Sequence, residues 1–146
     1  MIEFTKVVCY VVIDGRVLVF RHRDVPEAGI QVPAGTVDAG EDLEAAALRE
    51  ALEETGQAGL ELVAKVGEMD YVYDRSGRDE HPHRLELHHR HFFRLRPVAM
   101  LPERWSHFAD HHWFEFGWMD VGRAAELAVG QGAMLHRAVE HVRGEN

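Results

Sequence analysis

The alternation of apolar and polar residues predicts two strands at the start of the chain. Residues 5–13, TKVVCYVVI, are apolar and β-branched almost throughout, which indicates a strand covered on both faces. Asp14-Gly15 is a strong two-residue hairpin signal, and RVLVFRH, residues 16–22, returns as the second strand. After the loop DVPEAG, the segment IQVPAG at residues 30–35 is expected to be a short strand that leads into a helix.

A helix is predicted after an entry loop at residues 35–40. It runs to about Thr55, and Gly56 is suited to end it in the left-handed conformation. Asp38 or the segment at residues 40–41 is expected to cap its start, and acidic residues in the first turn suit the helix dipole. The region is therefore expected to fold as a loop, a helix and a second loop.

This helix is predicted to have two unlike faces. Ala45, Leu48 and Leu52 point to one side and form an apolar back. At about 100° per residue, three carboxylates fall within one arc of roughly 100° on the other side. They belong to Glu50, Glu53 and Glu54. Like charges three and four residues apart repel by a few tenths of a kcal/mol per pair, a penalty that a divalent cation would remove. A solvated acidic face is the alternative.

The second half of the chain predicts more strands. They are expected at residues 60–74, 85–97 and 113–119, and the first of them is long or bulged because its apolar periodicity is mixed. The connections are an exposed, mobile polar loop at residues 74–83 and a longer segment at residues 98–112.

Two helices are expected to close the chain, one over residues 121–128 and a C-terminal one through about Val142. Strands on both sides of one helix, with further helices at the end, favour a mixed sheet sandwiched between helices, which is an α/β fold. A length of 146 residues suggests one domain, residues 1–146, with a substantial core.

Composition narrows the class of function. A formal charge of −9 argues against non-specific binding to a nucleic-acid backbone, which needs a basic surface. It does not exclude a nucleotide, because a metal can bridge the phosphates. Cys9 is the only cysteine and is expected to be a buried core thiol, so a reducing compartment is natural. The apolar runs fall short of the ~20 residues that span a bilayer, and no leader opens the chain. These features predict a cytoplasmic protein with no membrane partner.

The segment from Gly35 to Gln57, GTVDAGEDLEAAALREALEETGQ, carries more than clustered carboxylates. It resembles the Nudix box, whose charged and glycine positions are all filled at the expected spacing. Those positions are Gly35, Glu41, Arg49, Glu50, Glu53, Glu54 and Gly56. Gln57 departs from the family pattern, which usually has an aliphatic residue there. A match of this length favours a functional site over a solvated acidic face, with Glu41 stabilising the loop–helix–loop rather than taking part in chemistry.

The resemblance implies an α/β/α Nudix sandwich with a mixed sheet. It also implies a Nudix-type pyrophosphohydrolase that cleaves a phosphoanhydride bond in a nucleoside diphosphate-linked substrate, such as a nucleoside triphosphate or a dinucleoside polyphosphate. The cofactor implied is Mg²⁺ or Mn²⁺. The expected partner is this small-molecule nucleotide, with no stable nucleic-acid partner, and the sequence does not indicate the oligomeric state.

The same resemblance assigns roles within the box. Glu53 and Glu54 are implied to bind the metal, with Glu50 as a further ligand or as the base that activates water. Arg49 is implied to orient the glutamates and can pair with Glu53 four residues on. The carbonyl of Gly35 is implied to complete the metal shell.

Candidate substrate residues outside the box rest on weaker signals. Arg21 and Arg23 either end the second strand as polar residues or contact phosphate, which suits the guanidinium fork. Tyr73 lies roughly where a tyrosine is associated with diadenosine-polyphosphate-cleaving relatives, although packing is the ordinary role of a strand tyrosine. The family commonly adds a carboxylate from outside the box. The candidates are Glu115, Asp79 and Glu80.

Two alternatives from other classes stay open. A Nudix-like fold can serve as a catalytically inactive nucleotide-sensing or protein-binding module, which the intact box disfavours. Eleven histidines also permit a transition-metal site. In a strand, His89 and His91 share one face and His88 opposes them, but no HExxH or Cys/His spacing is present.

Overall fold

The computed structural model describes residues 1–75 and 84–144. Strands make up more of it than helices do, and one long helix lies in the first half of the chain. The strands are β1 (Ile2–Ile13), β2 (Arg16–His22), β3 (Ala34–Thr36), β4 (Leu60–Asp74), β5 (Leu85–Pro97), β6 (Trp105–Ala109) and β7 (His112–Asp120). The helices are α1 (Leu43–Thr55) and α2 (Leu135–Gly144), with 3-10 turns η1 (Pro26–Ala28), η2 (Val121–Glu126) and η3 (Ala128–Gly130).

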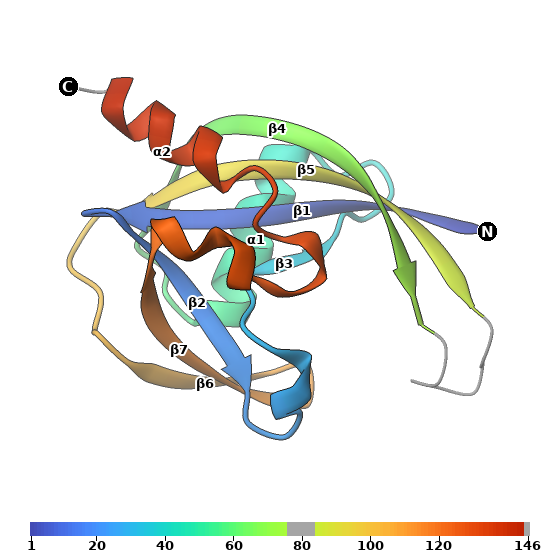
Figure 1. Ribbon diagram of the computed structural model, residues 1–146, viewed down its shortest axis with the longest axis horizontal. Coiled ribbons are helices and arrows are strands. Elements are labelled where there is room, and N and C mark those ends of the chain that lie inside the picture. Colours follow the sequence, from blue (N-terminus) through green and yellow to red (C-terminus); the bar gives the residue numbers. More distant parts are fainter. Residues whose placement is uncertain (76–83, 145–146) are drawn as a thin grey trace.

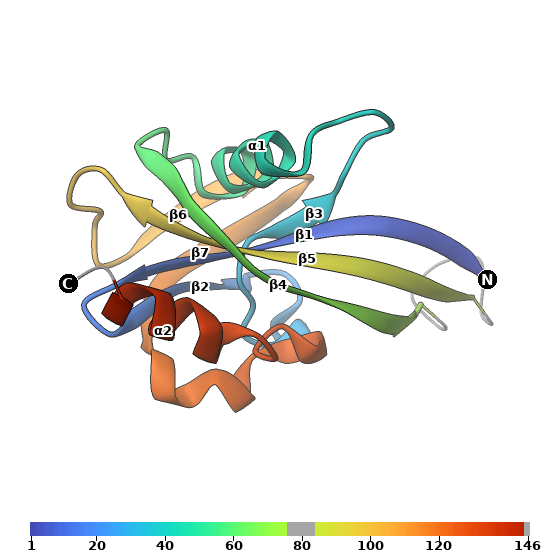
Figure 2. The ribbon, with the colours of Figure 1, turned by 90° about the horizontal axis from the view of Figure 1, so that it is seen from above.

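The strands form one mixed sheet in the order β4-β5-β1-β2-β7-β6, with β3 paired to β1. β1 and β5 run parallel, and the other pairs run antiparallel. Helix α1 covers one face of the sheet, while η2, η3 and α2 cover the other (Figures 1 and 2). The predicted sandwich of a mixed sheet between helices is therefore confirmed.

The first hairpin forms as the sequence predicts. Asp14 and Gly15 both adopt positive φ, at 52° and 74°, which is the backbone of a type I′ turn. The uninterrupted apolar run of β1 is explained by burial on both sides. Val7, Cys9 and Val11 belong to the core beneath α1. The residues that alternate with them, Val8, Tyr10 and Val12, belong to the core beneath α2. Cys9 is fully buried, as expected.

Helix α1 buries a different face from the one predicted. Leu48 and Leu52 are 36% and 47% exposed. The buried residues are Ala46, Ala47, Ala51 and Thr55. Small side chains let the helix lie close to β1, where the Cys9 Sγ donates a hydrogen bond to the Ala47 carbonyl at 3.4 Å. Because residues four apart form rows along a helix, the row of Glu50 and Glu54 borders the buried face instead of opposing it.

Other boundaries also differ from the prediction. The connection at residues 98–112 contains strand β6, which pairs with β7. The helix predicted at residues 121–128 is two 3-10 turns, η2 and η3. Between them Leu127 is extended, at φ −71° and ψ 131°, and its buried side chain joins the core beneath α2. The short strand expected at residues 30–35 begins later, at Ala34. None of the helices within residues 1–75 and 84–144 is long and apolar enough to cross a membrane.

His89 ties three strands together on the α1 side of the sheet. Its Nε2 lies 2.7 Å from Glu3 Oε1 on β1, and its Nδ1 lies 2.8 Å from Asp70 Oδ1 on β4. These two hydrogen bonds raise the pKa of His89. As expected, His91 shares this face, 3.5 Å from Glu68, while His88 lies on the opposite one, next to Tyr73.

We expect His89→Gln to make the stability of the protein less dependent on pH. A raised pKa in the folded state gives stability that is complete below the unfolded pKa of about 6.5 and is lost as pH rises through the folded pKa. The urea midpoint of the wild type should therefore exceed that of the variant at pH 6, and the gap should narrow by pH 9. His136→Gln, at an exposed site on α2, is the control. A gap of equal size at both pH values would contradict the prediction.

Candidate active site

The box joins β3 to α1 and folds as the predicted loop, helix and loop. Gly35 lies in β3 opposite Val7 of β1. The helix is capped by Asp42, whose side chain accepts a hydrogen bond from the Ala45 backbone N–H at 3.1 Å, and not by the residues predicted. Its end agrees with the prediction, because Gly56 adopts φ 71° and its backbone N–H bonds to the Leu52 carbonyl.

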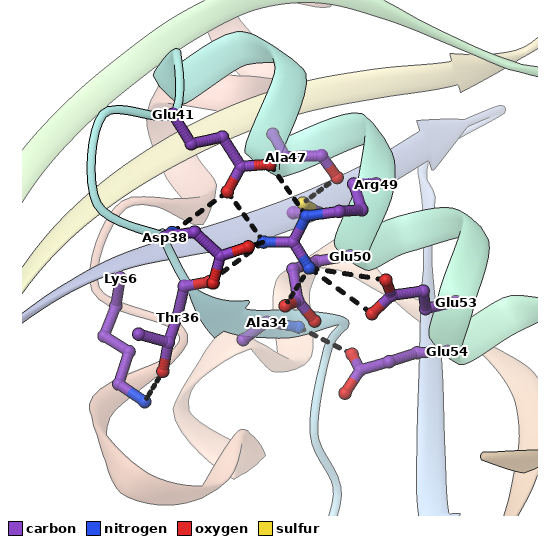
Figure 3. A network of polar contacts seen from close by, with 11 residues as sticks. Lys6, Ala34, Thr36, Asp38, Glu41, Ala47, Arg49, Glu50, Glu53 and Glu54 are labelled. Atoms are coloured by element: carbon purple, nitrogen blue, oxygen red, sulfur yellow. Dashed lines mark hydrogen bonds and ion pairs between the residues drawn. The ribbon is translucent and has the colours of Figure 1, made fainter. Parts of the chain in front are cut away.

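Arg49 is the centre of the polar network shown in Figure 3. Its guanidinium binds the Glu41 carboxylate through two hydrogen bonds of 2.7 and 2.8 Å. It also donates to Glu50 Oε1 at 2.8 Å and to the Thr36 carbonyl at 3.0 Å. The predicted contact with Glu53 is present but longer, at 3.4 Å. Arg49 therefore holds the entry loop and one box glutamate in fixed positions.

Glu41 acts within this network as the partner of Arg49. Its Oε1 also accepts a hydrogen bond from the Asp38 backbone N–H at 3.0 Å. These hydrogen bonds lower the pKa of Glu41 to about 2, so the carboxylate is charged and holds the loop to the helix. The sequence did not indicate that Glu41 would be the principal partner of Arg49, because eight residues separate them.

Glu50 lies against the backbone of Gly35. A Cβ atom on Gly35 would coincide with the Glu50 carboxylate, so only glycine leaves room for it. Glu54 reaches the same strand, where its Oε1 accepts a hydrogen bond from the Ala34 backbone N–H at 2.8 Å. Two adjacent positions of β3 thus face the carboxylates of two box glutamates; Figure 3 shows the contact of Glu54 with Ala34.

The charges of these glutamates are poorly compensated. Burial raises the pKa of Glu54 well above its ordinary value, and the charges of Glu50, Asp110 and Glu53 raise it further. The pKa of Glu50 is raised mainly by burial, against the hydrogen bond from Arg49. Asp110 in the β6–β7 turn was not among the sequence candidates. Only the folded hairpin brings its charge close enough to affect Glu50 and Glu54.

The donor set suits a hard divalent cation. Carboxylate and carbonyl oxygens are the ligands that Mg²⁺ and Mn²⁺ prefer, and a cation would offset the repulsion among the half-buried carboxylates. Within residues 1–75 and 84–144, no three His, Cys, Asp or Glu side chains are gathered as a ready-made ligand set. Glu50 and Glu54 instead bind Arg49 and Ala34. The oxygen donors of the box nevertheless fit such a cation, which the carboxylates of Glu50, Glu53 and Glu54 could hold.

A pocket of about 190 Å³ opens beside Gly35 on the α2 side of the sheet. Its walls carry four groups that are cationic or can become so. They belong to Lys6, Arg75, His88 and Arg90. Tyr73 also lines this pocket, stacked on His88 with ring centroids 5.2 Å apart. The pocket is thus lined by several basic side chains and reaches the box at Gly35.

The other sequence candidates lie elsewhere. Arg21 and Glu115 face each other across β2 and β7 and line a separate hollow that includes none of the box residues. Arg23 pairs with Glu115 at 2.5 Å and lies over the ring of Trp113. The structure therefore does not bring these three residues together with the box. Two further candidate carboxylates, Asp79 and Glu80, lie outside the described residues, as do His81, His83 and most of the polar loop predicted at residues 74–83.

Comparison with known proteins agrees with this architecture. Residues 3–138 match the model of the NUDIX domain. The chain belongs to this family. The resemblance identified from the box is thereby confirmed, and the predicted class, a Nudix-type pyrophosphohydrolase, is the class of enzyme that this family membership supports.

Two curated relatives of this Nudix chain are RNA pyrophosphohydrolases. That of Sphingopyxis alaskensis is 30% identical over 131 residues, covering 86% of this chain and 82% of the relative. That of Caulobacter vibrioides is 55% identical over 53 residues, covering 36% of this chain and 31% of the relative. The chain therefore matches only about a third of the length of the Caulobacter protein.

Solved structures share the fold across almost the whole Nudix chain. An ADP-ribose pyrophosphatase from Streptococcus suis superposes with a TM-score of 0.65 at 14% identity, covering 98% of this chain and 94% of that one. An Ap4A hydrolase from C. elegans gives a TM-score of 0.62 at 19% identity, covering 99% of each chain. Identities this low establish the fold alone.

Proposed function

We propose that this protein hydrolyses a phosphoanhydride bond in a nucleoside diphosphate-linked substrate with the help of Mg²⁺ or Mn²⁺. The observation that carries the proposal is the pair of half-buried carboxylates, Glu50 and Glu54, packed against adjacent residues of β3. Poorly compensated carboxylates at such a place are a recurrent property of catalytic sites. An inactive nucleotide-sensing module has no need to keep them.

We assign a separate role to each residue of the box. Glu53 and Glu54 would hold the cation together with the carbonyl of Gly35, and Glu50 either joins them or accepts the proton of the attacking water. When bound, the cation supplies neutralising charge at the pyrophosphate oxygens and makes water more acidic. Arg49 keeps Glu50 in place, and Glu41 keeps Arg49 in place.

A carboxylate from outside the box also influences its glutamates. Asp110 lies in the β6–β7 turn with φ 51°, and its charge acts on both Glu50 and Glu54. We therefore add Asp110 to the carboxylates that surround the reacting water.

The 5′ end of RNA is a second candidate substrate. Two relatives are RNA pyrophosphohydrolases, and one of them covers 86% of this chain. A formal charge of −9 disfavours contact with many RNA phosphates. A triphosphorylated 5′ end requires only that the terminal phosphates enter the site.

A turnover screen tests both candidates. It should compare nucleoside triphosphates, diadenosine tetraphosphate, ADP-ribose, a nucleotide sugar and a 5′-triphosphorylated RNA oligonucleotide, each with Mg²⁺ and with Mn²⁺. We expect cleavage of at least one compound that stops on addition of EDTA. Nucleotide binding without turnover under every condition would instead support the catalytically inactive module.

A further inference from the structure

We propose that the pocket beside Gly35 binds phosphate groups, with Lys6 as its anchor, so that the preferred substrate carries three or more linked phosphates. This inference rests on the proposed function for its meaning in catalysis, but phosphate binding by the pocket can be tested separately. This cavity, the Lys6 pocket, is lined by Lys6, Gly35, Tyr73, Arg75, His88 and Arg90.

Lys6 makes a direct hydrogen bond to a residue of the box. It lies opposite Thr36 across β1 and β3, and its Nζ donates a hydrogen bond to Thr36 Oγ1 at 2.7 Å (Figure 3). Among the described residues, no carboxylate forms an ion pair with this ammonium. Burial lowers the pKa of Lys6, and the charges of Glu86 and, to a smaller extent, Glu50 oppose this effect. The ammonium also lies 5.3 Å from the centre of the Phe4 ring, and within residues 1–75 and 84–144 its one hydrogen bond is to Thr36, which leaves N–H donors for an anion beside the box.

The other cations of the Lys6 pocket are held in place by partners. Arg75 Nε donates to Glu86 Oε2 at 3.0 Å, and His88 Nε2 lies 3.0 Å from Glu86 Oε1. Arg90 donates to the Val129 carbonyl at 2.6 Å. Glu86 is thus shared by two of these groups, so among the described residues the cations that line the pocket outnumber the carboxylates that pair with them. A preorganised positive pocket of this kind suits phosphate oxygens.

The shape and lining of the pocket disfavour a nucleobase. Pockets for drug-sized ligands usually enclose about 300–1,000 Å³, whereas this one encloses about 190 Å³. The two rings that line it, those of Tyr73 and His88, stack on each other at an interplanar angle of 10°. The guanidinium of Arg90, which also lines it, lies 4.0 Å from the centre of the Tyr71 ring. One or two phosphate groups fit this space and chemistry better than a flat base.

Direct binding of inorganic tripolyphosphate tests the pocket without turnover. Calorimetry in EDTA should compare the wild type with Lys6→Met and Lys6→Arg. We expect Lys6→Met to weaken binding by about 10- to 100-fold, as loss of one charged hydrogen bond does, and Lys6→Arg to retain most of it. Lys65→Met is the matched control, because the other lysine is exposed and pairs with Glu68 at 2.8 Å.

Kinetics then test the substrate class. Lys6→Met should raise the KM for ATP or diadenosine tetraphosphate by about tenfold or more with a smaller change in kcat, and should leave the KM for ADP-ribose nearly unchanged. Circular dichroism of the variant should match that of the wild type. Absence of tripolyphosphate binding to the wild type, or equal binding by Lys6→Met, would overturn the inference, as would a KM shift of equal size for ADP-ribose. If the wild type cleaves no anhydride but still binds tripolyphosphate through Lys6, the proposed function fails and the phosphate site stands.

Discussion

Replacing Glu54 with glutamine is expected to abolish metal-dependent phosphate release while the protein stays folded. The carbonyl of the new amide can still accept the hydrogen bond from the Ala34 backbone N–H, so the contact between α1 and β3 is kept. The substitution removes one negative charge from the site that holds the cation. Turnover at saturating Mg²⁺ should fall by about 10³-fold or more, at the upper end of what loss of one electrostatic contact to a transition state costs.

The effect of metal on the melting temperature tests the metal-binding role of Glu54 independently of turnover. A ligand that binds the native state raises the melting temperature with its concentration. Mn²⁺ should therefore raise the melting temperature of the wild type and of Glu44→Gln, a control at an exposed acidic position in the first turn of the same helix. It should have little effect on Glu54→Gln. Unchanged turnover of Glu54→Gln at saturating Mg²⁺ would remove Glu54 from the mechanism.

The parts of the fold that depend on local chemistry could be predicted from the sequence. Asp14-Gly15 takes the two positive φ values of a tight hairpin, and Gly56 ends α1. Both outcomes depend on the backbone freedom of a few residues that are neighbours in the chain. The apolar run of β1 likewise indicated burial on both faces, because no polar residue interrupts it.

The errors arose where tertiary packing overrides local pattern. The sequence indicated that Leu48 and Leu52 would be the buried residues of α1, but close approach to β1 requires alanine at the contact. Residues 121–128 have a helical pattern, yet Leu127 must extend to reach the core beneath α2. Strand β6 is short and depends on pairing with β7, which a local pattern does not reveal.

In the candidate site too, the sequence predicted some residues, and tertiary packing determined the others. The spacing of the box indicated the glutamates and Arg49, because the motif is contiguous in sequence. Asp110 and Lys6 gave no such signal, since each approaches the box only through strand pairing. Arg21 was a candidate as a charged residue at a strand end and Glu115 as a carboxylate from outside the box, but both line a different hollow. A motif therefore predicts the residues that it contains and says little about the walls of the pocket around them.

Gly35→Ala is expected to lower turnover by about 10²-fold without unfolding the protein. The added methyl group would occupy the place of the Glu50 carboxylate, so Glu50 must move and its hydrogen bond to Arg49 is lost. A displacement of about 1 Å at a catalytic group can cost this much in rate. Gly35 has no positive φ, so alanine is compatible with the backbone of β3 and its pairing with Val7.

Gly117→Ala is the matched control for this prediction. Gly117 is also a strand glycine without positive φ, and a Cβ there meets no atom within 4 Å. Turnover of Gly117→Ala should equal that of the wild type, which would show that the effect at Gly35 comes from the carboxylate and not from the loss of a strand glycine. Equal turnover of Gly35→Ala and the wild type would mean that catalysis tolerates a displaced Glu50. The close approach of Glu50 to Gly35 would then be a packing feature, and Glu53 and Glu54 would have to hold the cation without it.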